Sequence, residues 1–110
     1  MDVRGNLDLL LLAVLAAEGP GHGYALIAAL RDRSEGVFDL PEGTVYPALH
    51  RLERAGLVAS RWEQATPRKR RVYELTSEGR LARVNKQREW RSFVDGVQSV
   101  LGPITARGTA

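Results

Sequence analysis

Apolar residues along the chain fall into helix-like stretches, separated by two shorter stretches that alternate like strands. The first stretch, residues 7–17, is apolar at every position except Asp8. Asn6 before it is a typical N-cap, so the pattern predicts a helix that starts there. Because this helix lacks a polar stripe, we expect one side to pack on its own domain. The other side, including Leu9 and Leu12, is expected to pack on a second subunit.

Two further helices are predicted over residues 24–33 and 41–55, each with apolar residues on one face. A Ser-Glu-Gly turn ends the first of these helices, and a glycine follows the second. Pro47 inside the later helix is unfavourable, because proline cannot donate a backbone hydrogen bond. Pro47 fits the first helical turn if Gly43 or Thr44 is the effective cap.

Two segments, 57–63 and 71–75, have the residue types and alternation of strands. Between them lie a turn-forming Thr-Pro pair and three cations, and a fourth cation, Arg71, begins the second segment. This arrangement predicts a two-stranded antiparallel hairpin with its tip over residues 64–70.

The last predicted helix is long and has an apolar seam. Thr76 or Ser77 is expected to cap its start, and Glu78 in the first turn complements the helix dipole. The seam has the 4-3-4 spacing of a coiled coil, which predicts a dimer contact. Its members are Trp90, Val94, Val97 and Leu101. A Gly-Pro pair at 102–103 ends the helix.

The order helix, helix, helix, hairpin, long helix predicts a fold class that is mostly α with a small β-hairpin. It is the order of a winged helix-turn-helix followed by a C-terminal dimerisation helix. We assign residues 1–76 to the winged helix-turn-helix domain and 77–102 to the dimerisation helix. Residues 103–110 are expected to form a disordered tail.

Composition is that of an ordinary globular chain. Its 110 residues are 44% hydrophobic and 26% charged and include no cysteine, which excludes disulfides and thiolate metal sites. No apolar stretch reaches the roughly 18 residues of a membrane span, and the N-terminus lacks the basic region of a signal peptide. We therefore expect no membrane partner, and the lack of cysteine suits a cytoplasmic protein.

Positive charge is concentrated in one part of the chain. Residues 44–71 contain seven cations against two glutamates, whereas the whole chain carries a net charge of only +3. Such a concentration is typical of a surface that binds a polyanion, although a solvated basic surface is the alternative. Glu53 inside this segment is expected to pair with Arg54 or Arg33.

The outer face of the helix over residues 41–55 is the candidate DNA-reading surface, because a recognition helix places such residues in the major groove. Arg51 is expected to pair with guanine O6 and N7. Tyr46 either contacts a thymine methyl group or a phosphate, or packs against the second helix. His50 either contacts DNA or is merely solvated. The residues predicted to face DNA from this helix are Thr44, Tyr46, Pro47, His50, Arg51 and Arg54.

The hairpin tip is the second candidate DNA-binding element. Arg68, Lys69 and Arg70 are expected to contact phosphates, with one arginine entering a narrow minor groove. A solvated tip is the alternative. Arg71 either joins these cations or points back along its strand.

Four motifs resemble the PadR family of bacterial transcriptional regulators. They cover nearly the whole chain in the family's order and spacing. The motifs are LDLLLLAVL at 7–15, HGYAL at 22–26, GTVYPALHRLERAGLV at 43–58 and YELTSEG at 73–79. With one C-terminal helix, the chain looks like the shorter PadR subfamily.

The resemblance implies a homodimer that binds an operator and represses transcription. It places Tyr24 near the DNA backbone. In some similar regulators, an aromatic residue of the last helix and its dimer mate enclose a flat ligand, and Trp90 with Phe93 could do so here. Plain dimer packing is the alternative for both rings.

Two other classes of function fit the sequence less well. An enzyme is disfavoured because the only histidines, His22 and His50, lie on separate helices and no metal-binding or nucleophile motif is present. No cofactor or metal is expected. The runner-up is a winged helix that binds a protein without specific DNA binding. Such a module usually lacks dense cations at its hairpin tip, and salt-sensitive binding to duplex DNA separates the two.

Overall fold

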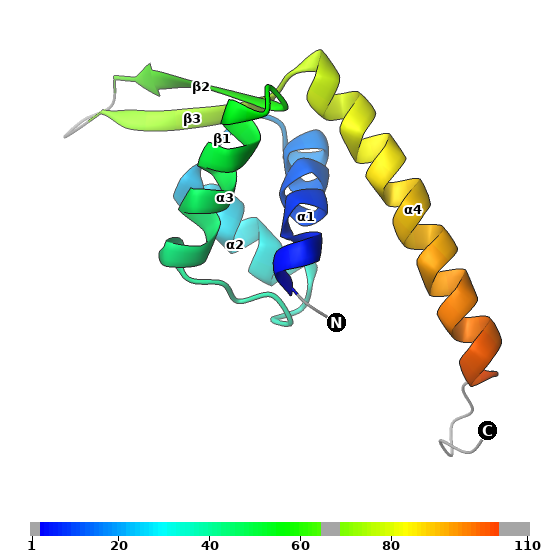
Figure 1. Ribbon diagram of the computed structural model, residues 1–110. Coiled ribbons are helices and arrows are strands. Elements are labelled where there is room, and N and C mark those ends of the chain that lie inside the picture. The colour runs from blue at the N-terminus through cyan, green and yellow to red at the C-terminus, as the bar shows by residue number, and fades with distance from the viewer. Residues whose placement is uncertain (1–2, 65–68, 104–110) are drawn as a thin grey trace.

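The computed structural model describes residues 3–64 and 69–103, in which four helices accompany a small antiparallel sheet (Figure 1). The elements are α1 (Val3–Glu18), β1 (Gly21–His22), α2 (Gly23–Arg33), α3 (Glu42–Arg54), β2 (Val58–Glu63), β3 (Arg70–Leu75) and α4 (Ser77–Leu101). The predicted class, mostly α with a hairpin and a long last helix, is confirmed.

The core forms where α1, α2 and α3 pack together beneath one face of the sheet (Figure 1). The apolar run of α1 supplies the largest share of it, because α1 contacts α2, α3, α4 and β3. The buried core residues are Leu7, Leu11, Leu12, Val14, Leu15, Leu26, Leu30, Val45, Ala48, Leu49, Leu52, Val58, Tyr73 and Leu75.

The start of α1 differs from the prediction. The helix begins at Val3, so Asn6 lies inside its first turns and is not the N-cap. The polar residues before the apolar run continue the same helical backbone. A capping residue type therefore gave a boundary that was a few residues late, which is the usual error of such signals.

The sheet has three strands where a two-stranded hairpin was expected. β1 pairs with β3 through Gly21 opposite Tyr73 and His22 opposite Val72, giving the order β1-β3-β2. A strand of two residues is too short to show alternation, so the sequence pattern could not predict it. Its pairing covers the edge of β3 that would otherwise expose backbone groups.

A tight junction fixes where the hairpin and α4 leave the core. Thr76, one of the two predicted caps, caps α4, because its Oγ1 accepts from the Gly79 N–H at 3.0 Å. The Thr76 hydroxyl also donates to the Gly56 carbonyl at 2.7 Å. A Cβ on Gly79 would collide with the carbonyl oxygen of Leu57. Only glycine therefore allows the first turn of α4 to sit against the end of α3.

Helix α4 runs away from the body along the side of α1 (Figure 1). It has 25 residues, and Gly79 is its only buried one. The radius of gyration is 16.2 Å, whereas about 13 Å is typical of a compact chain of this size. The far part of α4 therefore has little of its own chain to pack on. No helix in the described part of the chain is apolar and long enough to cross a bilayer.

Candidate nucleic-acid interface

Helix α3 has one buried and one exposed face, as a groove-binding helix requires. Its inner face carries the buried residues Val45, Ala48, Leu49 and Leu52. Its outer face exposes Thr44, Pro47, His50, Arg51 and Arg54. Five of the six predicted reading residues therefore lie on the exposed face, and Tyr46 is half-buried.

Pro41, not Gly43 or Thr44, is the N-cap of α3, because its carbonyl accepts from the N–H groups of Thr44 and Val45. Pro47 consequently lies inside the helix and not in its first turn. Pro47 has no N–H to donate to the carbonyl of Gly43, four residues earlier. The helix tolerates the missing hydrogen bond because Gly43 is exposed. This corrects the expectation that Pro47 falls in the first turn.

The C-terminal end of α3 is a Schellman motif. Gly56 adopts φ = 79°, its N–H donates to the Glu53 carbonyl, and the Leu57 N–H donates to the Leu52 carbonyl at 3.0 Å. This glycine turn sends the chain directly into β2. The proposed recognition helix and the hairpin are therefore joined by a short, hydrogen-bonded turn.

Tyr46 packs against the start of α2. A Cβ on the buried Gly23 would overlap the hydroxyl end of the Tyr46 ring, so Gly23 makes room for it. Burial, and then the nearby Glu42 carboxylate, raise the pKa of the Tyr46 hydroxyl. The structure thus shows the packing role that was the alternative for Tyr46, and only its remaining exposed part faces outward.

Tyr24, in contrast, is 70% exposed at the start of α2. This is the position where the family resemblance places a residue beside the DNA backbone. His50 is also exposed, on the outer face of α3.

Arg51 forms an ion pair that the sequence did not indicate. Its Nη2 lies 2.6 Å from Oδ1 of Asp8 on α1. The Arg51 side chain keeps 46% of its surface exposed, so part of the guanidinium still faces outward. Arg51 therefore both ties α3 to α1 and presents donors on the outer face.

The cations of the hairpin and of the last residue of α3 fall into two groups. Arg61 is 3.2 Å from Glu74, and Arg71 is 3.7 Å from Glu53. In residues 3–64 and 69–103, no ion pair involves Arg54, Lys69 or Arg70, and all three are exposed. Arg68 lies outside the described residues. The available positive charge is thus smaller than the sequence count suggests, and it gathers at the tip and at the end of α3.

Glu53 pairs with Arg71 and not with Arg54 or Arg33, contrary to the expectation. Arg71 was expected either to join the tip cations or to point back along its strand, whereas it contacts Glu53 on α3 and Ser60 on β2. Sequence reasoning missed Ser60 and Trp62, which also contact Arg71. The hairpin register offered a signal, because Trp62 stands opposite Arg71.

The residues predicted to mediate dimerisation lie in different environments. Leu12 is 0% exposed and belongs to the core, so it has no surface for a partner, and this assignment is corrected. Leu9 is half-buried on α1. On α4, Trp90 and Val94 are half-buried, while Val97 and Leu101 are 37% and 64% exposed. The seam on α4 therefore remains largely uncovered by its own chain.

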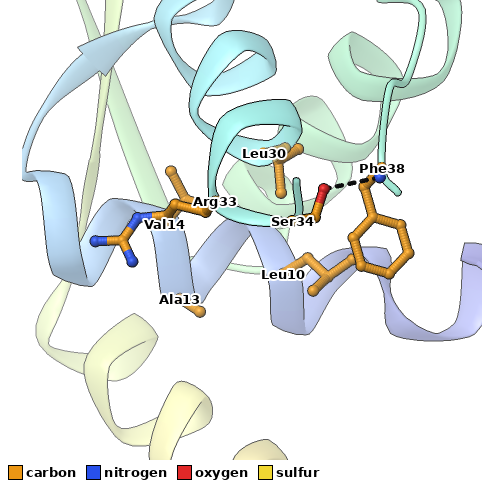
Figure 2. A pocket seen from close by; sticks show the side chains of 7 residues that line it. All are labelled: Leu10, Ala13, Val14, Leu30, Arg33, Ser34 and Phe38. Atoms are coloured by element: carbon orange, nitrogen blue, oxygen red, sulfur yellow. Dashed lines mark hydrogen bonds between the residues drawn. The ribbon is translucent and has the colours of Figure 1, made fainter. Parts of the chain in front are cut away.

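Trp90 and Phe93 lie side by side on α4, with ring centroids 5.8 Å apart and planes inclined by 33°. Phe93 is exposed. A separate apolar depression of about 290 Å³ opens between α1, α2 and the segment that follows α2 (Figure 2). Its lining residues are Leu10, Ala13, Val14, Leu30, Arg33, Ser34 and Phe38. The aromatic pair is not part of this depression.

In the part of the chain that the structure describes, no three His, Asp or Glu side chains lie close enough together to hold a metal ion.

The class of protein follows from three features: a helix that fits a DNA groove, an adjoining hairpin with exposed cations, and a helix-turn-helix core. This is a winged helix-turn-helix protein of the kind that binds duplex DNA.

Residues 11–85 match the Transcriptional regulator PadR-like family, and the chain belongs to this family. It is 40% identical over 73 residues to Transcriptional regulator Rv3488 of Mycobacterium tuberculosis, covering 66% of this chain and 65% of that protein. The matched region thus spans about two thirds of that relative.

Solved structures show the same architecture. A transcriptional regulator from Clostridium thermocellum superposes with a TM-score of 0.83 at 28% identity, covering 91% of this chain and 97% of that one. A PadR family transcriptional regulator from Eggerthella lenta gives a TM-score of 0.79 at 35% identity, covering 89% and 83%. The chain is a PadR-family transcriptional regulator, a family of DNA-binding proteins that are generally not enzymes.

Proposed function

We propose that this regulator is a repressor that binds a specific operator as a homodimer in the cytoplasm. In this proposal residues 1–76 bind DNA and residues 77–102 dimerise. Of the tail expected over residues 103–110, all but the first residue lie outside the described part of the chain. The observation that carries the proposal is the exposed face of α3 beside a hairpin whose Lys69 and Arg70 are exposed. Such a pair of elements fits a major groove and the adjacent phosphates.

Each element has its own task. The outer face of α3 enters the major groove, and the hairpin that extends beyond α3 follows the backbone (Figure 1). Tyr24 approaches the backbone from the start of α2. The proposed DNA contacts are Tyr24, Thr44, Tyr46, Pro47, His50, Arg51, Arg54, Arg68, Lys69 and Arg70.

Dimerisation is supported by the exposed seam of α4. Helix α4 has 25 residues and only one of them is buried, so most of its apolar side chains remain in contact with water. A partner that covered them would be stabilised by the hydrophobic effect. Trp90, Val94, Val97 and Leu101 repeat at coiled-coil spacing and supply that surface. Leu9 on α1 lies half-buried and adds to the proposed contact.

A flat aromatic effector that relieves repression is a further part of the proposal. It is supported by the exposed Phe93 ring beside Trp90 on the proposed dimer helix. Titration of a planar aromatic dye should quench Trp90 fluorescence in a Trp62→Phe variant and release the operator from the unmodified protein. An unchanged Trp90 spectrum would contradict this part alone.

The proposal is tested by selecting bound duplexes from a random pool with the full chain. We expect an enriched pair of inverted half-sites spaced by about one helical turn. We also expect a dimer in analytical ultracentrifugation and affinity that falls steeply with salt. A monomer that ignores duplex DNA at low ionic strength would refute the proposal. Salt-insensitive binding to a protein would favour the alternative, a winged helix that acts as a protein-binding module.

A further inference from the structure

Arg71 differs from the neighbouring hairpin cations because it makes contacts to three other residues. Its Nε donates to Ser60 Oγ at 2.9 Å, and its Nη2 lies 3.7 Å from Glu53 Oε2. Its guanidinium carbon is 5.1 Å from the centre of the Trp62 ring. The Ser60 hydroxyl in turn donates to Glu53 Oε2 at 2.5 Å. One guanidinium thus connects both strands of the hairpin to the last turns of α3.

The register explains why these groups meet. Trp62 is the cross-strand partner of Arg71, and Ser60 is the partner of Tyr73, so their side chains share one face of the hairpin. The buried Tyr73 and the contact to Glu53 show that this is the face turned toward α3. Arg61 lies on the opposite face, where it pairs with Glu74 at 3.2 Å.

Geometry and charge make this contact more than an ordinary surface ion pair. The Arg71 and Glu53 side chains are only 36% and 30% exposed, and a hydroxyl bridges them. A planar guanidinium can donate in two directions and stack on a ring at once, which a lysine ammonium cannot do. Because Glu53, Ser60 and Trp62 all contact the Arg71 guanidinium, and only 36% of the side chain is exposed, fewer of its donors remain for a phosphate than at Arg51.

We propose that Arg71 is a positioning residue that fixes the angle between the hairpin and α3, rather than a phosphate contact. The inference rests on the proposed function, because the fixed angle matters when α3 lies in the groove and Lys69 and Arg70 meet the backbone together. Glu53 is the anchor on α3, and Ser60 and Trp62 hold the guanidinium in orientation.

The test compares variants on one fluorescein-labelled duplex enriched from the random pool, at several salt concentrations. We expect Arg71→Ala and Arg71→Lys each to weaken binding by about 10-fold with the slope of log K against log salt unchanged. Lys69→Ala, which removes a phosphate contact, should lower that slope by about 0.9. Arg61→Ala is the matched control, because it removes a paired hairpin cation that does not contact α3, and it should bind like the wild type.

For Glu53→Gln, the direction of the change in DNA affinity separates the two explanations. Removing a negative charge beside DNA should strengthen binding if only electrostatics mattered, whereas loss of the anchor for Arg71 should weaken it. The double variant Arg71→Ala/Glu53→Gln should lose no more affinity than either single variant, because both break the same contact. In a Trp90→Phe background, Arg71→Lys should also change the fluorescence of Trp62.

The inference fails if Arg71→Lys binds like the wild type, or if Arg71→Ala lowers the salt slope as Lys69→Ala does. It also fails if Glu53→Gln strengthens binding. Thermal unfolding of each variant, read by circular dichroism, confirms that the compared proteins are folded. A wild-type protein without salt-dependent duplex binding would instead refute the proposed function itself.

Discussion

Arg51 on α3 and Asp8 on α1 form a direct contact, with Nη2 of the arginine 2.6 Å from Oδ1 of the aspartate across 43 residues of sequence. The residue expected to read a base is therefore also attached to the helix that forms the centre of the core. A variant of Arg51 can therefore change DNA binding either through a lost base contact or through a lost contact between α3 and α1.

Arg51→Ala should relax the base preference of the protein. Loss of a bidentate guanine contact costs about 1–3 kcal/mol of discrimination, and 46% of the Arg51 side chain is exposed and could make such a contact in the proposed complex. The measurement is a repeat of the duplex selection with the variant, followed by titration of single-base substitutions in the operator.

Asp8→Asn is the control for this prediction, because it removes the ion pair and leaves Arg51 in place. We expect a changed affinity but the same preferred sequence. If both variants weakened all duplexes by the same factor, Arg51 would act only by holding α3 on α1.

Gly79→Ala should destabilise the fold by about 1–3 kcal/mol or more, as an added methyl group does in a filled space. The new Cβ would collide with the backbone carbonyl of Leu57, which cannot move without shifting the end of α3. Gly43→Ala is the matched control, because its Cβ would meet no atom within 4 Å. That helical substitution should stabilise by about 0.5–1 kcal/mol. Urea unfolding measures both, and equal effects would contradict the role given to Gly79.

Val97→Asp should convert the proposed dimer to a monomer, because it places a charge in the middle of the α4 seam. Operator affinity should fall by about 100-fold or more as the two half-sites lose their linkage. Sedimentation velocity and operator titration measure the two effects. Ser92→Asp adds the same charge at an exposed position outside the seam and should stay dimeric. A dimeric Val97→Asp protein would refute the proposed seam.

Stability should fall under alkaline conditions. Burial is the main cause that raises the pKa of Tyr46 and Tyr73 above the usual 10.0. The charge of Glu42 raises the pKa of Tyr46 further. At Tyr73, Arg71 lowers the pKa and Glu53 raises it, but burial remains the largest effect. Because the fold favours the neutral phenols, their contribution is complete below about pH 10 and is lost as the pH rises through the raised values. Urea unfolding between about pH 8 and pH 11 measures this loss. Tyr46→Phe should make it smaller, and an unchanged pH dependence would contradict the assignment.

Much of the fold was predictable because its signals are local. The apolar stripes of α2 and α3, the alternation of β2 and β3 and the threonine cap of α4 each depend on neighbours within a few residues. β1 escaped prediction because two residues carry no period. Pro47 was misplaced because a proline signals a boundary without showing which preceding residue is the cap.

The candidate site was predictable in composition and only partly in geometry. The sequence by itself determined a winged helix with cations concentrated near α3 and the hairpin, because hydrophobic periodicity and residue type can be read from neighbouring positions in the chain. Only the tertiary structure decided that Arg51 and Arg71 have acidic partners, that Leu12 is buried and that Tyr46 fills the space left by Gly23. These outcomes depend on which distant side chains meet when the helices pack, and no local pattern encodes that meeting.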